Sequence, residues 1–177
     1  MKEPAIPDKI DVLVNPSEIM IRRKWLGWEV VPLAIFCIAW DSFLFFWYSM
    51  ALGGEKAPWI AIVFPIGHVA VGVGLTYYVV ASIFNTTDLS ISASKITVWS
   101  YPIPWGPRTV VNTDDIVDVR IKHTSSSNGK SSYGIRYKNR SNREKSLIRG
   151  GLNDDQAEFI EYHMRKTLNL KDPEEGA

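Results

Sequence analysis

The sequence predicts an α+β membrane protein, in which an N-terminal transmembrane helical hairpin is followed by a small antiparallel β domain that a C-terminal amphipathic helix closes. Two long apolar stretches lie in the first half of the chain, Trp25 to Met50 and Trp59 to Phe84. Beyond residue 85, apolar and polar residues alternate, as in half-buried strands. The last regular segment has the apolar spacing of an amphipathic helix.

Each apolar stretch is long enough to cross a membrane. A helix needs about 20 residues, at ~1.5 Å per residue, to span the roughly 30 Å hydrocarbon layer. The linker, Ala51 to Pro58, has room only for a tight reversal. We therefore expect a hairpin over residues 25–84, with spans at about 25–50 and 59–84, after a cytoplasmic N-terminal segment at 1–24.

The distribution of positive charge predicts the orientation. Arg22, Arg23 and Lys24 precede the first span, whereas the linker carries only Lys56, balanced by Glu55. Because cytoplasmic flanks are enriched in Lys and Arg, both termini are expected in the cytoplasm. A mixed-charge segment precedes the first span, so a cleaved export signal is not expected. The aromatic residues expected to anchor the spans in the lipid interfaces, or alternatively to contact a partner, are Trp25, Trp28, Trp47, Tyr48 and Trp59.

Asp41 and His68 are predicted to form an intramembrane polar pair. They lie almost equally far along the chain from the linker centre, so antiparallel helices would bring them to one depth. An ionisable residue in a span costs roughly 2.5 to 3.5 kcal/mol on insertion scales and is expected to find a partner. We interpret the pair as a hydrogen-bonded bridge that fixes the helix register. A proton relay or a cofactor site is the alternative.

His68 could also serve as an axial ligand. Haem b commonly needs two histidines, but His123 and His163 lie in the polar part of the chain, whereas a chlorophyll-type pigment needs one. No cofactor is expected, and a tetrapyrrole pigment or haem at His68 stays the alternative. The simpler interpretation of the small residues around His68 is that they let the two helices, or a neighbour's helix, approach closely. These residues are Gly67, Ala70, Gly72 and Gly74.

The chain beyond the hairpin is expected to form one β domain over residues 85–170, with a polar tail at 171–177. Six strands are predicted, near residues 89–91, 96–101, 110–111, 116–121, 133–137 and 145–148. Asn153 and Gln156 have the spacing of a helix capping box. His163 is expected at the edge of the apolar stripe of the helix that follows, which consists of Ala157, Ile160, Met164 and Leu168.

No motif in the sequence specifies a reaction, so an enzyme is not expected. The adjacent pairs Asp114-Asp115 and Asp154-Asp155 are explained as turn and cap residues, because neighbours on a strand point apart. The single cysteine, Cys37, excludes a disulfide framework and a thiol metal site. No cluster has the spacing of metal ligands, and no small-molecule substrate is expected.

A basic surface is predicted around the turn at residues 139–142. We interpret it as the solvated face of the strands, with anionic lipid or an acidic protein surface as alternative ligands. Nucleic acid is not expected, since the domain is almost balanced in charge and lacks a recognition motif. The basic residues are Arg136, Lys138, Arg140, Arg143, Lys145 and Arg149.

The order of these elements resembles that of bacterial membrane proteins with pleckstrin-homology-like (PH-like) domains. More narrowly, the chain resembles a set of uncharacterised bacterial two-span proteins with a cytoplasmic PH-like domain. The residues that carry this resemblance are Trp25, Trp40, Phe43, Trp47 and Tyr48, His68 to Tyr78, Asn85 to Thr87, and Pro102 to Trp105. The resemblance implies a PH-like fold and a place in the bacterial cytoplasmic (inner) membrane, and it brings no catalytic residues.

These observations predict a non-catalytic accessory or scaffold subunit. Its hairpin is expected to pack on a larger integral membrane complex, with a respiratory or photosynthetic assembly as plausible hosts, while its cytoplasmic domain clamps the polar face of that complex. The alternative is a membrane-anchored PH-like module that binds anionic lipid or a cytosolic protein.

Overall fold

The computed structural model describes residues 3–53, 58–127 and 129–170. The chain forms two compact units. The helical unit comprises Trp25–Asn85, and the β unit combines the chain before Trp25 with the chain after Asn85. The fold is therefore α+β, as predicted, with two long apolar helices and antiparallel sheets.

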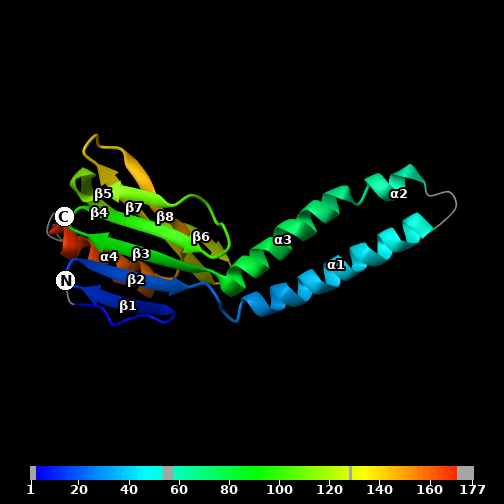
Figure 1. Cartoon of the computed structure of the whole chain (residues 1–177), viewed down its shortest axis with the longest axis horizontal. Coiled ribbons are helices and arrows are strands. Elements are labelled where there is room, and N and C mark those ends of the chain that lie inside the picture. The colour runs from blue at the N-terminus through cyan, green and yellow to red at the C-terminus, as the bar shows by residue number, and fades with distance from the viewer. Residues whose placement is uncertain (1–2, 54–57, 128, 171–177) are drawn as a thin grey trace. The chain divides into compact units, whose positions relative to one another are not determined.

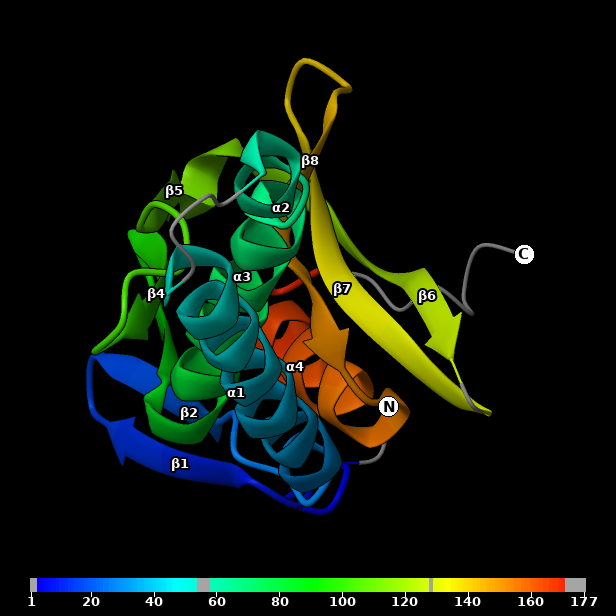
Figure 2. The same cartoon turned by 90° about the vertical axis from the view of Figure 1, so that its right-hand side faces the viewer.

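The helical unit contains α1 (Val30–Gly53), α2 (Trp59–Val63) and α3 (Ile66–Phe84), and α1 packs against α3 (Figures 1 and 2). Val30–Gly53 and Trp59–Phe84 are long and apolar enough to cross a membrane, which suggests a membrane protein. In the most apolar 18-residue window of each stretch only 11% of the residues are buried, whereas a core helix of a soluble protein is mostly buried.

The helix boundaries differ from the predicted spans at both ends of α1. The helix begins at Val30, so Trp25 and Glu29 precede it, and it runs to Gly53, into the predicted linker. The remainder of that linker before Pro58 lies outside the described residues. Pro65 separates α2 from α3, because proline lacks the N–H group that a continuous helix would donate.

The β unit contains two antiparallel sheets. The first has the order β1-β2-β3-β4-β5 and the second the order β6-β7-β8 (Figure 1). The strands of the first sheet are β1 (Ile10–Asn15), β2 (Glu18–Lys24), β3 (Thr86–Ser92), β4 (Lys95–Tyr101) and β5 (Thr109–Asn112). The strands of the second sheet are β6 (Ile116–Ser127), β7 (Lys130–Asn139) and β8 (Glu144–Leu152).

The prediction of a separate N-terminal segment at residues 1–24 is wrong. These residues supply β1 and β2, and β2 pairs along its whole length with β3, from Lys24 opposite Thr86 to Glu18 opposite Ser92. Alternation of apolar residues buries Ile21 and leaves Arg22 on the other face, as pairing in a sheet requires. The β unit is therefore discontinuous in sequence, and the helical unit is inserted between two neighbouring strands of one sheet.

The C-terminal helix α4 (Asp154–Leu168) completes the core. The Asn153 side chain accepts a hydrogen bond from the Gln156 N–H, and the Gln156 side chain accepts one from the Asn153 N–H, which confirms the capping box. The helix contacts β6 and β7 of one sheet and β3 of the other. Its buried residues join one core with residues of both sheets, and the core includes Ile21, Leu89, Ile91, Ile96, Val119, Ile135, Leu152, Ala157, Phe159, Ile160 and Met164.

Candidate functional site

The polar centre of the helical unit is formed by Asp41 and Thr76. The Thr76 hydroxyl donates a 2.7 Å hydrogen bond to Asp41 Oδ2. Gly72, one helical turn before Thr76, is buried against the same part of α1. A Cβ atom at position 72 would lie 2.8 Å from Asp41 Oδ1 and 3.2 Å from Trp40 Cδ1. Glycine is therefore required here for the close approach of α1 and α3.

The predicted hydrogen bond between Asp41 and His68 is not formed. The Trp40 ring stacks on the His68 ring, with a distance of 5.7 Å between the ring centroids. The centroid of the Phe64 ring lies 5.4 Å from that of the His68 ring. His68 Nδ1 is buried without a hydrogen-bond partner. Equal distance from the linker does not define which face of a helix a side chain occupies, and Trp40 occupies the place that the prediction gave to Asp41. The Asp41–His68 pair is thus corrected to an Asp41–Thr76 pair.

Of the four small residues predicted to mediate helix packing, only Gly72 lies between α1 and α3. A Cβ atom at Gly67 or Gly74 would meet nothing within 4 Å, and Ala70 is exposed. Their places on α3 therefore leave these three positions on outward faces of the helical unit. Within this hairpin the prediction is confirmed for Gly72 but not for Gly67, Ala70 or Gly74, whose contact with a neighbour's helix stays a prediction.

An open groove of about 630 Å³ runs between α1 and α3 beside Asp41. Apart from the carboxylate of Asp41 and the hydroxyl groups of Thr76, Tyr48 and Tyr77, its lining is aliphatic or aromatic. The other lining residues are Leu44, Phe45, Val69, Val73 and Val80. The groove therefore combines a long apolar surface with one carboxylate.

The aromatic residues predicted as lipid anchors fall into two groups. Trp28 and Trp59 are each 71% exposed, and Trp25 is half-buried. Trp47 Nε1 donates to the Ala61 carbonyl at 3.0 Å, and the Tyr48 hydroxyl donates to the Ile62 carbonyl at 3.1 Å.

The bond of Trp47 has a direct cause in Pro65. Proline has no N–H, so the Ala61 carbonyl, four residues earlier, loses its usual helical donor. Trp47 supplies that donor from the other helix. Within the helical unit, Trp47 and Tyr48 hence connect α1 to α2.

Replacing Trp47 with phenylalanine is expected to weaken the packing of α1 on α2 by about 1 kcal/mol, because the ring stays but the Ala61 carbonyl loses its donor. The measurement is loss of helicity of the full chain on titration with a denaturing detergent. Trp59→Phe, at an exposed ring, is the matched control. Equal effects of the two substitutions would contradict a specific role of the Trp47 indole N–H.

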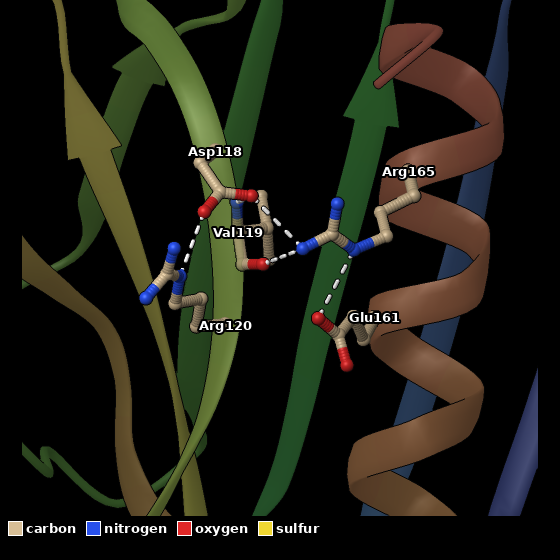
Figure 3. Close-up of polar contacts among 5 residues, drawn as sticks. All are labelled: Asp118, Val119, Arg120, Glu161 and Arg165. Carbon is tan, nitrogen blue, oxygen red and sulfur yellow. Dashed lines mark hydrogen bonds and ion pairs between the residues drawn. The ribbon is translucent and has the colours of Figure 1, made fainter. Parts of the chain in front are cut away.

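In the β unit, Arg165 of α4 forms a partly buried polar network with β6 (Figure 3). The Arg165 side chain is 5% exposed. Its guanidinium donates to Asp118 Oδ1 at 2.9 Å, to Glu161 Oε1 at 3.1 Å and to the Val119 carbonyl. Arg120 donates to the other Asp118 oxygen at 2.7 Å. The network fastens the last turns of α4 to the edge of the second sheet.

The two carboxylates of this network respond differently to burial. Burial would raise the pKa of Asp118, but hydrogen bonds and charge from Arg120 and Arg165 outweigh it and hold that pKa below its ordinary value. Burial raises the pKa of Glu161, and Arg165 offsets only part of that increase. The contacts of Arg165 with β6 and with its own helix are those of a structural anchor.

A second ion pair joins neighbouring strands of the first sheet. Arg22 of β2 donates to both oxygens of Asp88 of β3, each at 2.8 Å, and the Tyr101 hydroxyl donates to Asp88 Oδ2 at 2.8 Å. Burial opposes ionisation of Asp88, yet the hydrogen bonds from Arg22 and Tyr101 hold its pKa below the ordinary value. One of the basic residues used to predict orientation therefore also fixes the pairing of β2 with β3.

His163 is 7% exposed, so it belongs to the core side of α4 and not to the edge of the stripe. Its ring lies between those of Phe159 and Tyr162, with centroids 4.4 and 5.2 Å away, and Nδ1 has no hydrogen-bond partner. Burial lowers the pKa of His163, an effect that the charge of Glu3 partly opposes. The folded β unit therefore favours the neutral imidazole.

Acidification is expected to destabilise the β unit through His163. In the unfolded chain histidine takes up a proton near pH 6.5, whereas folded His163 resists protonation to lower pH, so stability falls as pH drops through that range. The measurement is the urea midpoint of the full chain at pH 7.5 and pH 5.5. In His163→Leu the difference between the two midpoints is expected to shrink, and an unchanged difference would contradict this role of His163.

The six predicted basic residues all lie on β7, β8 or the turn between them, and all are exposed or half-buried. Arg136 pairs with Glu144 across the two strands at 3.0 Å. The turn itself is held by the Asn139 side chain, which accepts a hydrogen bond from the Arg143 N–H at 2.8 Å. The sequence therefore predicts where the basic residues lie, but it does not predict which of them form ion pairs.

In the part of the chain that the structure describes, no three His, Cys, Asp or Glu side chains are grouped to hold a metal ion. Cys37 is a buried free thiol within α1.

Comparison with known proteins gives no match to a protein-family model and no match to a curated protein sequence.

Proposed function

We propose that this chain is a non-catalytic accessory subunit whose helical unit packs, as a transmembrane hairpin, against a larger integral membrane complex. The observation that carries the proposal is the groove beside Asp41, which is open, largely apolar and placed within a stretch that could span a membrane. A carboxylate at membrane depth is expected to face protein or water rather than lipid. A transmembrane helix of a partner lying in the groove would meet that requirement.

The insertion of the hairpin between β2 and β3 supports the proposed topology. Since Lys24 lies opposite Thr86, the chain leaves the β unit and returns to it at neighbouring positions. Both ends of the hairpin then lie on one side of the membrane. The positive residues before the first span favour the cytoplasmic side, and the sequence resemblance supports the bacterial inner membrane.

The β unit is proposed to act as a PH-like cytoplasmic domain that clamps the polar face of the host complex. Its two antiparallel sheets and the C-terminal helix that packs on both support this assignment. A respiratory or photosynthetic assembly stays a plausible host. A bound pigment or haem at His68 is the alternative for that residue, with its unpartnered Nδ1 in its favour and the Trp40 ring stacked on the imidazole against it.

A photo-reactive amino acid placed in the groove tests the proposal. Val73 is 66% exposed and lines the groove, whereas Val71, on the same helix, is 53% exposed and lies outside the groove lining. In native membranes, position 73 is expected to give a crosslinked product of one defined mass that contains a membrane-protein partner, and position 71 is not. Equal or diffuse crosslinking from both positions would contradict a specific partner at the groove.

The second candidate function is a membrane-anchored module that binds anionic lipid or a cytosolic protein. The exposed basic residues on β7, β8 and their turn favour it, because each near-surface charge gains ~1 kcal/mol at an anionic leaflet. Binding of this kind weakens with salt. Salt dependence therefore separates it from the subunit proposal.

A further inference from the structure

The second sheet has a hollow of about 220 Å³ that carries a concentration of positive charge. Core residues such as Ile135 and Tyr137 of β7 point to the other face, so the hollow lies on the side of the sheet away from the core. All three strands contribute to it. Its lining residues are Lys122, His123, Thr124, Gly134, Arg136, Ser146, Ile148 and Arg149.

Gly134 of the central strand β7 lines the hollow and lies close to the backbone of β8. A Cβ atom at this position would lie 2.5 Å from the Ile148 carbonyl oxygen and 3.0 Å from the backbone of Arg149. The pairing of β7 with β8 is irregular at this point, between Tyr133 and Arg136. Glycine at this position therefore lets the β8 backbone approach the central strand closely, in a place where any side chain would collide with it.

The charges that line the hollow are not all neutralised. Arg136 pairs with Glu144, but among the described residues neither Lys122 nor Arg149 forms an ion pair. No carboxylate belongs to the lining. Thr124 and Ser146 add hydroxyl groups that can donate hydrogen bonds.

We propose that this hollow is a binding site for a phosphate group. Lys and Arg provide charge-assisted hydrogen bonds, which are the strong contacts to phosphate oxygens. The volume favours a single small oxyanion, since pockets for drug-sized molecules measure roughly 300–1,000 Å³. The site draws only Arg136 and Arg149 from the basic surface predicted from the sequence and adds Lys122 from β6. It does not depend on the accessory-subunit proposal.

The test is titration of the full-length, isotope-labelled chain in zwitterionic detergent with inorganic phosphate, followed by NMR. Saturable shifts are expected at the amides of residues 122–124 and 146–149. In the double variant Lys122→Gln/Arg149→Gln, the apparent Kd for phosphate is expected to rise about tenfold. The matched control, Arg140→Gln/Arg143→Gln, removes the same net charge outside the hollow and is expected to change the Kd less than twofold.

A second titration with a short-chain phosphatidylglycerol distinguishes the source of the phosphate. Shifts of the same amides with this lipid would assign the site to a lipid headgroup, and shifts with inorganic phosphate alone would assign it to a free phosphate. Absence of saturable shifts with both ligands would overturn the proposal. Equal weakening by the two double variants would also overturn it, because it would show diffuse attraction to the basic surface.

Discussion

Arg165→Leu is expected to lower the free energy of unfolding of the β unit by about 3 kcal/mol, because Glu161 then loses its cation and Asp118 keeps only the exposed Arg120. The lost contacts are those to Asp118, Glu161 and the Val119 carbonyl. Removal of one partner from a buried ion pair costs about 3–5 kcal/mol. The low end applies here, since the raised pKa of Glu161 lets it take up a proton more readily than an exposed carboxylate.

Urea denaturation of the full chain in detergent, followed by the far-ultraviolet circular dichroism of its strands, measures this loss. Arg120→Gln is the control, because Arg120 binds the same Asp118 but is 73% exposed, and exposed pairs contribute no more than about 1 kcal/mol. The two variants remove the same charge from the same network. If Arg165→Leu were no more destabilising than Arg120→Gln, the network would not be the anchor of α4.

Gly72→Leu is expected to separate α1 from α3 at a cost of about 1–3 kcal/mol, the usual range for overpacking. The new side chain would collide with Asp41, Trp40 and Leu44, all of which lie within 3.4 Å of a Cβ atom at position 72. The hydrogen bond between Thr76 and Asp41 would be disturbed at the same time. Spin labels on α1 and α3, measured by pulsed electron paramagnetic resonance, would report an increased distance.

Gly74→Leu is the matched control for that experiment. A Cβ atom at position 74 meets nothing within 4 Å, and both substitutions gain the same helix propensity, up to about 1 kcal/mol. The control should therefore keep the distance between the helices. An increase of that distance in Gly74→Leu, or none in Gly72→Leu, would contradict the assignment of Gly72 as the point of close approach.

Much of the secondary structure is readable from local pattern. The apolar stretches predict both long helices, and period-two alternation predicts the six strands after residue 85, each of which the structure contains. The capping box of α4 is a signal of only four residues, Asn153 to Gln156, and it is confirmed. These features can be predicted because the interactions that cause them lie within a few neighbouring residues.

The two N-terminal strands carried a signal that the prediction overlooked. Asp11 to Val14 and Ile19 to Ile21 are rich in β-branched and other apolar residues, and they flank the turn at Pro16 and Ser17, as in a hairpin. The interpretation of residues 1–24 as a flank of the membrane span hid this pattern. The partner strand β3 follows the hairpin by more than sixty residues of sequence, so the pairing itself has no local signature.

The polar contacts of the candidate site could not be predicted for a different reason. Counting from the linker estimates the depth of Asp41 but not the faces that Trp40, Gly72 and Thr76 occupy. From the sequence alone Arg165 would be expected to lie on the exposed face of its helix. Its burial depends on where α4 contacts β6, the edge strand of the second sheet. Such contacts are tertiary, and no spacing within one element encodes them.

The central claim is that the hairpin belongs to a larger membrane complex, and purification of the tagged full-length chain from native membranes in mild detergent tests it most directly. The sample is washed at low salt and at about 1 M salt, where the screening length is only ~3 Å. High salt removes partners that are held by charge and keeps partners that are held by packing of apolar surfaces. Mass spectrometry and an absorption spectrum of the same sample identify partners and any pigment. We expect integral membrane partners in fixed stoichiometry that survive high salt and are lost in Gly72→Leu but not in Gly74→Leu. A chain that runs alone at both salt concentrations would contradict the claim.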